Sequence, residues 1–72
     1  MDFVIFGAQS IALSTYQAFH HIYPQKNIRC FLVSQIGNNS PILAGIPVLE
    51  LSAFAEGLSP EQKDNTRVFI AT

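Results

Sequence analysis

Near the amino terminus, the short stretch Phe3-Val4-Ile5-Phe6 stops at Gly7. Every residue of this stretch before the glycine is aliphatic or aromatic. An uninterrupted apolar run of this length, bounded by glycine, is typical of a parallel strand that other elements cover on both faces. The chain is therefore expected to build an α/β fold around this strand.

A helix is predicted directly after this strand, with Ser10 as its cap and an end near Tyr23. Residues of one helical face recur at intervals of four, three and four: Ala12, Tyr16, Phe19 and Tyr23. Pro24 ends the helix, since the residue before a proline is pushed out of the α region. The next apolar run, residues 28–33, is predicted to be a second buried strand, which completes a βαβ unit.

The middle of the chain, residues 35–47, is predicted to be mostly loop because glycine and proline recur in it. Its Asn38-Asn39-Ser40 run is interpreted as a turn near the carboxyl ends of the strands, where α/β proteins bind ligands. Residues 46–49 are predicted to form a short strand. Because Pro47 cannot donate to a β-ladder, this strand is expected at an edge of the sheet.

The last third of the chain predicts two short helical segments and a final strand. The first segment spans residues 51–56, with Gly57 as its C′ residue. The second begins at Ser59-Pro60-Glu61-Gln62, which has the form of a capping box with proline at the first helical position. Residues 67–71 are predicted to be the last apolar strand.

These elements predict one domain over residues 1–72. Its fold class is α/β, with a partial Rossmann-like, mostly parallel sheet of about three or four strands and flanking helices. The expected order across the sheet is the short strand 46–49, then 28–33, then 3–6, then 67–71. A flavodoxin-like order is the alternative.

Size and composition indicate that the domain needs help to be stable. The chain has 72 residues, of which 49% are hydrophobic and 12% charged. A domain of this length buries only about 60% of the surface that its unfolded chain exposes. Its single cysteine, Cys30, excludes an internal disulfide. We therefore expect the full protein to continue beyond residue 72, and we expect this stretch by itself to self-associate through the uncovered surfaces of its last strand.

Charge and hydropathy exclude several partners. The net charge is −1, so the chain lacks the basic footprint of a nucleic-acid-binding protein. No apolar run approaches the roughly 20 residues of a membrane span, and no signal-peptide pattern is present, so membrane insertion is not expected. A lone cysteine inside an apolar strand fits a reducing compartment, and a cytoplasmic location is expected.

The best candidate for a binding site is the turn after the first strand, formed by Gly7, Ala8, Gln9 and Ser10. Gly7 keeps the role of the first glycine in a dinucleotide-binding fingerprint, but Gln9 stands where a second glycine would let the backbone approach a pyrophosphate. Ser34 follows the second strand, where NAD sites carry an acidic residue. These two departures argue against NAD. The alternative is that Gly7 only permits the turn and Ser10 only caps the helix.

The remaining polar residues predict neither a catalytic set nor a metal site. His20 and His21 are adjacent on a helix, so they point about 100° apart and do not share a ligand. Cys30 is interpreted as a buried strand residue rather than a nucleophile. The acidic residues are scattered, with no pair placed for acid–base chemistry.

The whole pattern nevertheless resembles a known family. The resemblance rests on residues 3–8 (FVIFGA), 30–34 (CFLVS), 45–49 (GIPVL) and 68–71 (VFIA), and covers nearly the whole chain. These pieces are similar to a small Rossmann-like domain at the N-terminus of bacterial sugar acyltransferases. A similar domain precedes the glycosyltransferase domains of capsular polysaccharide and lipopolysaccharide synthesis proteins. The most distinctive piece is residues 44–48, Ala-Gly-Ile-Pro-Val.

The resemblance implies a non-catalytic module of a bacterial surface-polysaccharide glycosyltransferase, with a downstream catalytic domain as its partner. In the acyltransferase members the domain holds a nucleotide-sugar, which implies that Gly7, Ala8, Gln9 and Ser10 line the phosphate side and that Ser34 replaces an acidic residue. No catalytic residue and no cofactor are carried over. The alternatives are the nucleotide-sugar-binding domain of a sugar acyltransferase, or an assembly domain, such as a homo-oligomer, without a small-molecule ligand.

Overall fold

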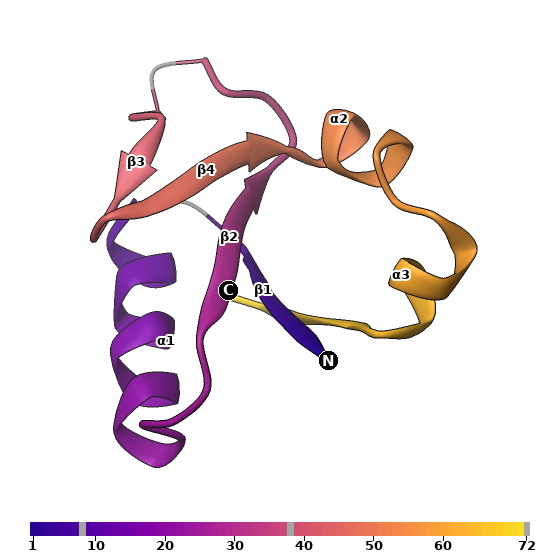
Figure 1. Ribbon diagram of the computed structural model, residues 1–72. Coiled ribbons are helices and arrows are strands. Elements are labelled where there is room, and N and C mark those ends of the chain that lie inside the picture. The colour runs from indigo at the N-terminus through magenta and orange to yellow at the C-terminus, as the bar shows by residue number, and fades with distance from the viewer. Residues whose placement is uncertain (8, 38, 72) are drawn as a thin grey trace.

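The structure is a computed structural model that describes residues 1–7, 9–37 and 39–71, without the side chain of Gln9. It is a small α/β domain in which one sheet separates two layers of helix (Figure 1). The elements in chain order are β1 (Asp2–Phe6), α1 (Gln9–Ile22), β2 (Ile28–Val33), β3 (Ile42–Leu43), β4 (Ile46–Glu50), α2 (Leu51–Glu56), α3 (Pro60–Asp64) and β5 (Thr66–Ile70).

The sheet has the order β3-β4-β2-β1-β5 and is mostly parallel. β1 pairs in parallel with β2 on one side and with β5 on the other, and β2 pairs in parallel with β4. This confirms the order predicted for the four apolar strands. The expected strand number was too low, because β3 joins the sheet antiparallel to β4 and makes the sheet mixed.

The prediction that the strand containing Pro47 lies at an edge was wrong. β4 is internal, since the two-residue strand β3 lies outside it in a hairpin. β4 tolerates the proline because its register with β2 runs from Val48 to Glu50, so Pro47 precedes that ladder. The hairpin also shows that residues 35–47, predicted to be mostly loop, contain a strand that the sequence pattern did not reveal.

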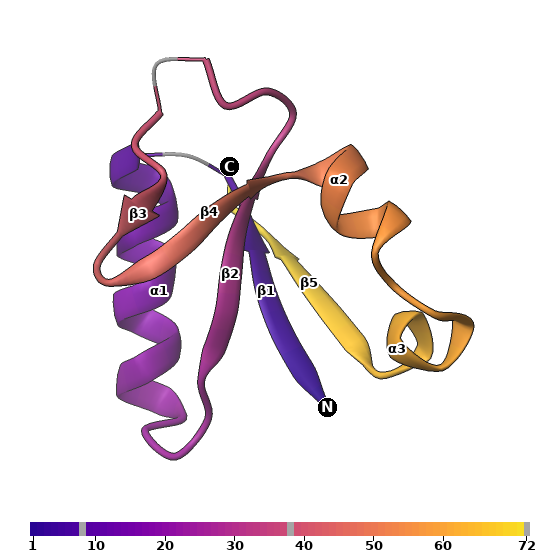
Figure 2. The same ribbon diagram turned by 45° about the horizontal axis from the view of Figure 1, so that its top comes forward.

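The two faces of the sheet are covered by different helices (Figure 2). On one face α1 contributes Ala12 and Phe19 to a cluster with Ile5 and other strand residues. On the other face Val4 joins a cluster against which Phe54 of α2 packs. Neighbouring residues of a strand point to opposite faces, so the uninterrupted apolar runs of β1 and β2 supply both clusters.

The helix boundaries largely follow the sequence signals, with two corrections at their ends. α1 begins at Gln9, so Ser10 is the second helical residue rather than the cap. Gly57 is the C-cap of α2, in a right-handed conformation (φ −82°, ψ −4°), rather than the C′ residue that was predicted. Tyr23 lies just beyond α1 and is exposed, although it packs on the ring of the buried Phe19 at 5.3 Å.

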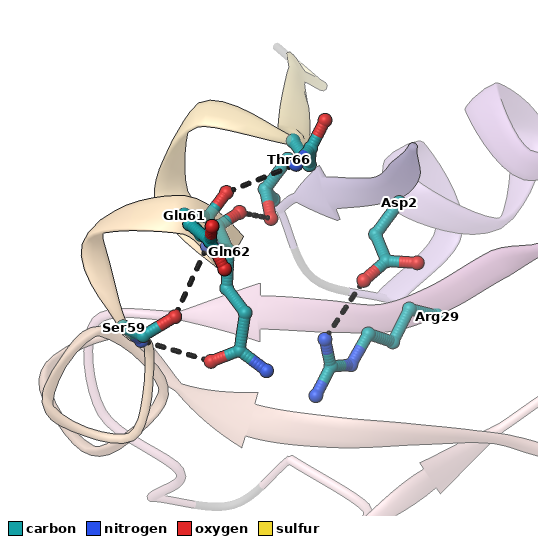
Figure 3. A network of polar contacts seen from close by, with 7 residues as sticks. Asp2, Arg29, Ser59, Glu61, Gln62 and Thr66 are labelled. Carbon is teal, nitrogen blue, oxygen red and sulfur yellow. Dashed lines mark hydrogen bonds and ion pairs between the residues drawn. The ribbon is translucent and has the colours of Figure 1, made fainter.

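The capping box before α3 is confirmed. The Gln62 amide N–H donates to Ser59 Oγ at 3.2 Å, and the Ser59 amide donates to Gln62 Oε1 at 2.8 Å (Figure 3). Pro60 occupies the first helical position. A proline has no N–H, but at this position an N–H would have no acceptor within the helix, so no hydrogen bond is lost. This local arrangement starts α3 and leads the chain into β5.

The β3–β4 hairpin turns through Ala44 and Gly45, both with positive φ (54° and 77°). Positive φ at both central residues is the geometry of a type I′ turn, which is favoured in two-residue hairpins. Gly45 adopts it freely, whereas Ala44 is strained by its Cβ.

We predict that Ala44→Asn stabilises the domain by about 1 kcal/mol, because Asn-Gly is the preferred pair of a type I′ turn. Urea unfolding of the variant and the parent chain measures this difference. The matched control is Ala53→Asn on exposed helix α2, where the same change should destabilise by about 0.5 kcal/mol. A loss of stability at both positions would contradict the interpretation of the turn.

Candidate functional site

A cleft of about 510 Å³ opens at the carboxyl ends of β1 and β2. It is lined by residues from both strand ends and the loop that follows β2: Phe6, Gly7, Val33, Ser34, Gln35 and Asn39. β1 and β2 are parallel neighbours and end side by side, so the residues that follow them meet at one edge of the sheet. Gly7 and Ser34, which are distant in sequence and were both predicted as site residues, therefore line the same cleft.

The other predicted site residues are not placed there by the structure. Ala8 lies outside the described residues, and for Gln9 only the backbone at the start of α1 is described. Ser10 is exposed on the first turn of α1 and is not one of the residues that line the cleft. The structure thus brings together two of the five predicted residues, Gly7 and Ser34.

The loop after β2 contributes Asn39, which belongs to the run 38–40 that was expected to form a turn near the carboxyl ends of the strands. Asn38 of this run lies outside the described residues. The Asn39 amide N–H and its side-chain Nδ2 both donate to the carbonyl of Ile36, at 2.7 and 2.9 Å. Glu50, at the end of β4, accepts a hydrogen bond from the Ile36 amide at 3.1 Å. Glu50 thereby ties the cleft loop to the sheet, a role that no sequence signal indicated.

The chemistry of the cleft is neutral and hydrogen-bonding. Ser34 offers a hydroxyl, Gln35 and Asn39 offer amides, and Phe6 and Val33 supply apolar surface. None of these lining side chains carries a charge near neutral pH. Hydroxyl and amide groups beside apolar surface suit an uncharged polar ligand group, such as a sugar hydroxyl or the edge of a base.

Residues 1–7, 9–37 and 39–71 bring together no group of three His, Cys, Asp or Glu side chains able to hold a metal ion. In the same part of the chain, no helix has the length and apolar character of a membrane-crossing segment.

Gly7 has a packing role that does not depend on any ligand. Its φ is +154°, and a Cβ at this position would lie 2.9 Å from Cβ of Ala71 and 3.1 Å from the Ala71 carbonyl oxygen. The Gly7 amide donates to the carbonyl of Leu32 at 2.9 Å, and the Ala71 amide donates to the carbonyl of Phe6 at 2.8 Å. Only a residue without a side chain lets the ends of β1, β2 and β5 approach this closely.

We therefore predict that Gly7→Ala destabilises the domain by about 2 kcal/mol or more, through backbone strain and collision with Ala71. Chemical denaturation measures the effect. The matched control is Gly57→Ala, where the added Cβ would meet its nearest atoms at 3.6 and 3.7 Å and φ is −82°. The control should be neutral or slightly stabilising. Equal losses in the two variants would contradict the packing role.

Cys30 is confirmed as a buried strand residue. Burial raises the pKa of its thiol above 9.0; Arg29 opposes this rise and Asp2 adds to it. Arg29 and Asp2 form an ion pair at 2.9 Å beside the sheet (Figure 3). Both side chains are about half exposed, so the pair contributes little stability, about 0–1 kcal/mol. The thiol is protonated at neutral pH, which argues against a nucleophilic role.

The raised pKa of Cys30 predicts a pH effect on stability. Above pH 9.0 the unfolded chain releases this proton before the folded chain does, so stability falls as the pH rises. The free energy of unfolding of the parent chain should exceed that of Cys30→Ala by a constant amount below pH 9.0, and the gap should narrow above it. Urea titrations at several pH values measure the gap. A gap that stays constant up to about pH 11 would contradict burial of the thiol.

Comparisons of the chain with protein-family profiles, curated proteins and solved structures find no match in any of the three.

Proposed function

We propose that the chain is a non-catalytic, Rossmann-like binding module that holds a nucleotide-sugar for a bacterial surface-polysaccharide glycosyltransferase. The observation that carries the proposal is the cleft at the carboxyl ends of β1 and β2, where Gly7 and Ser34 meet. In open α/β sheets, ligands bind outside the carboxyl ends of the strands, at the point where the strand order reverses. In this sheet the order reverses between β1 and β5, and the cleft adjoins that point at the end of β1. The cleft therefore lies at the edge of the sheet where this class of fold binds ligands, beside the switch point.

The lining of the cleft supports a ligand rich in hydroxyl groups. Ser34, Gln35 and Asn39 can donate and accept hydrogen bonds without carrying charge, as binding of sugar or base edges requires. The Gly7 amide already donates to Leu32, so it is not available to a phosphate. In this proposal the diphosphate lies toward the first turn of α1, whose amide groups have no helical acceptors.

The same residues support binding rather than catalysis in this module. Hydroxyl and carboxamide side chains orient a ligand, but they do not exchange protons readily near neutral pH. In the proposal, a downstream domain of the same protein in the cytoplasm performs the transfer. The alternative within the same resemblance is a sugar acyltransferase, in which the module would hold the nucleotide-sugar that is acylated.

An assembly domain is the second candidate function, and a different observation favours it. β5 exposes large apolar side chains at Val68, Phe69 and Ile70. Exposed apolar residues that gather on one strand are typical of an interaction surface. This candidate requires no ligand in the cleft.

Titration of the chain with UDP-sugars, followed by calorimetry and by amide chemical shifts, tests the nucleotide-sugar proposal. We expect shifts at Gly7, Ser34 and Asn39, which line the cleft. Ser34→Ala should weaken binding by about threefold to tenfold, the value of one hydrogen bond. The matched control is Ser52→Ala on exposed α2, which should leave affinity unchanged.

Titrations with UDP, with the free sugar and with the UDP-sugar test the contribution of each half of the ligand. UDP alone and the free sugar should each bind more weakly than the UDP-sugar, because each keeps only part of the contacts. No heat and no shift at Gly7 or Ser34 at about 5 mM ligand would contradict the proposal. Shifts at β5 that follow the concentration of the chain and not that of the ligand would favour the assembly domain instead.

A further inference from the structure

The two edges of the sheet differ in whether their outward backbone groups have hydrogen-bond partners. At the outer edge formed by β3, the Ser40 hydroxyl caps the backbone of Ile42: Ser40 Oγ donates to the Ile42 carbonyl at 2.8 Å and accepts from the Ile42 amide at 3.3 Å. This strand is also only two residues long and follows Pro41. Short strands and prolines are devices that keep an edge from pairing with another chain.

The opposite edge, formed by β5, lacks these devices. Asp2 N–H donates to the Asn65 carbonyl at 2.7 Å, and Ala71 N–H donates to the Phe6 carbonyl at 2.8 Å. The backbone groups of residues 65 and 71 therefore point toward β1. Because backbone groups alternate in direction along a strand, those of residues 67 and 69 point toward β1 as well. The backbone groups of Thr66, Val68 and Ile70 point outward, away from the sheet.

These outward groups are largely unpaired in the part of the chain that the structure describes. The Thr66 carbonyl accepts a long contact from Arg67 Nη1 at 3.4 Å, while Val68 and Ile70 have no partner for theirs among the described residues. The side chains of Val68 and Ile70 are 48% and 63% exposed. An exposed, apolar strand edge with free backbone groups is a template for another strand.

We propose that a second copy of this chain covers the β5 edge by antiparallel strand pairing, with the two-fold axis at Val68. The outward residues are spaced symmetrically about this point. Val68 would face Val68 of the second copy, and Thr66 would face Ile70 of the second copy on either side. Each facing pair exchanges two hydrogen bonds, so the junction would contain about six backbone hydrogen bonds and join the two sheets into one.

The side chains of β5 fit this register. Phe69 lies opposite Arg67 of the second copy on the face covered by α1, so each arginine meets an aromatic ring instead of the other arginine. Phe69 already stacks on Phe3 at 6.0 Å and packs on Phe19 at 5.5 Å, beside a cavity of about 200 Å³. Arg67 Nη1 now donates to the carbonyls of Asp64 and Thr66, at 3.1 and 3.4 Å, and Arg67 would exchange these exposed contacts for the ring.

The self-complementary register is the reason to assign the edge to a second copy. No like charges face each other directly in it, and the net charge of −1 per chain imposes little repulsion. The junction is short, so the dimer should be weak, with dissociation at concentrations of about 0.1–1 mM. The proposal rests on the assembly candidate described above and is independent of any ligand in the cleft.

Cysteine cross-linking tests the register. In the proposed pair the two Val68 Cα atoms would lie about 5.5 Å apart, within the range that a disulfide spans. Diamide, which accepts the two protons and two electrons of a thiol pair, should link Val68→Cys into dimers. Thr66→Cys is the matched control, since the two Thr66 Cα atoms would lie about 14 Å apart. The native Cys30 is buried and should not compete. Equal linking of both variants, or preferential linking of Thr66→Cys, would overturn the register.

Sedimentation equilibrium tests the dimer without covalent capture. Val68→Lys places like charges directly opposite each other and should weaken the dimer at least tenfold. Ile70→Lys adds the same charge on the same strand at a more exposed site, but it faces Thr66, so it should weaken the dimer less than threefold. Circular dichroism verifies that both variants fold. A parent chain that stays monomeric at about 1 mM, or equal effects of the two variants, would overturn the proposal.

Discussion

The structure depends on the burial of β1 on both of its faces. Val4 and Ile5 are adjacent in sequence, both are fully buried, and they point into different clusters. Burial of one such side chain contributes about 1.5–3 kcal/mol, so a strand that is apolar on both faces stabilises two layers at once. The same burial requires a neighbour on each side, because buried backbone N–H and C=O groups need partners. β2 and β5 fill these places.

The candidate site is a consequence of how this central strand ends. β1 stops at Gly7, where the chain turns toward α1 and packs against Ala71 at the end of β5. β2 ends beside it at Val33, so Ser34 and the following loop form the other wall of the cleft. Glu50 then ties that loop to β4 through the Ile36 amide. Core packing thus determines the place of the cleft, and the neutral side chains after β2 determine its chemistry.

The two sheet edges follow from the same chain path. The loop after β2 returns as the β3–β4 hairpin, and Ser40 caps the outer backbone of Ile42. β5 enters from α3 on the other side and carries Val68, Phe69 and Ile70 at an open edge. One edge is therefore closed by local hydrogen bonds, whereas the other offers backbone groups and apolar side chains together. Another strand can therefore extend the sheet at the β5 edge, but not at the β3 edge.

The features that depend on short-range chemistry could be predicted from the sequence. The apolar run of β1, the buried strand β2 and the capping box at Ser59 each follow from residues close together in the chain. By contrast, the internal place of β4 and the hydrogen bond by which Glu50 holds the cleft loop became visible only in the folded chain. These features depend on contacts between distant segments, and a two-residue strand such as β3 is too short to show a hydrophobic period. The packing role of Gly7 also became visible only in the folded chain. Ala71, at the end of the neighbouring strand, lies so close that it leaves no room for a Cβ on residue 7.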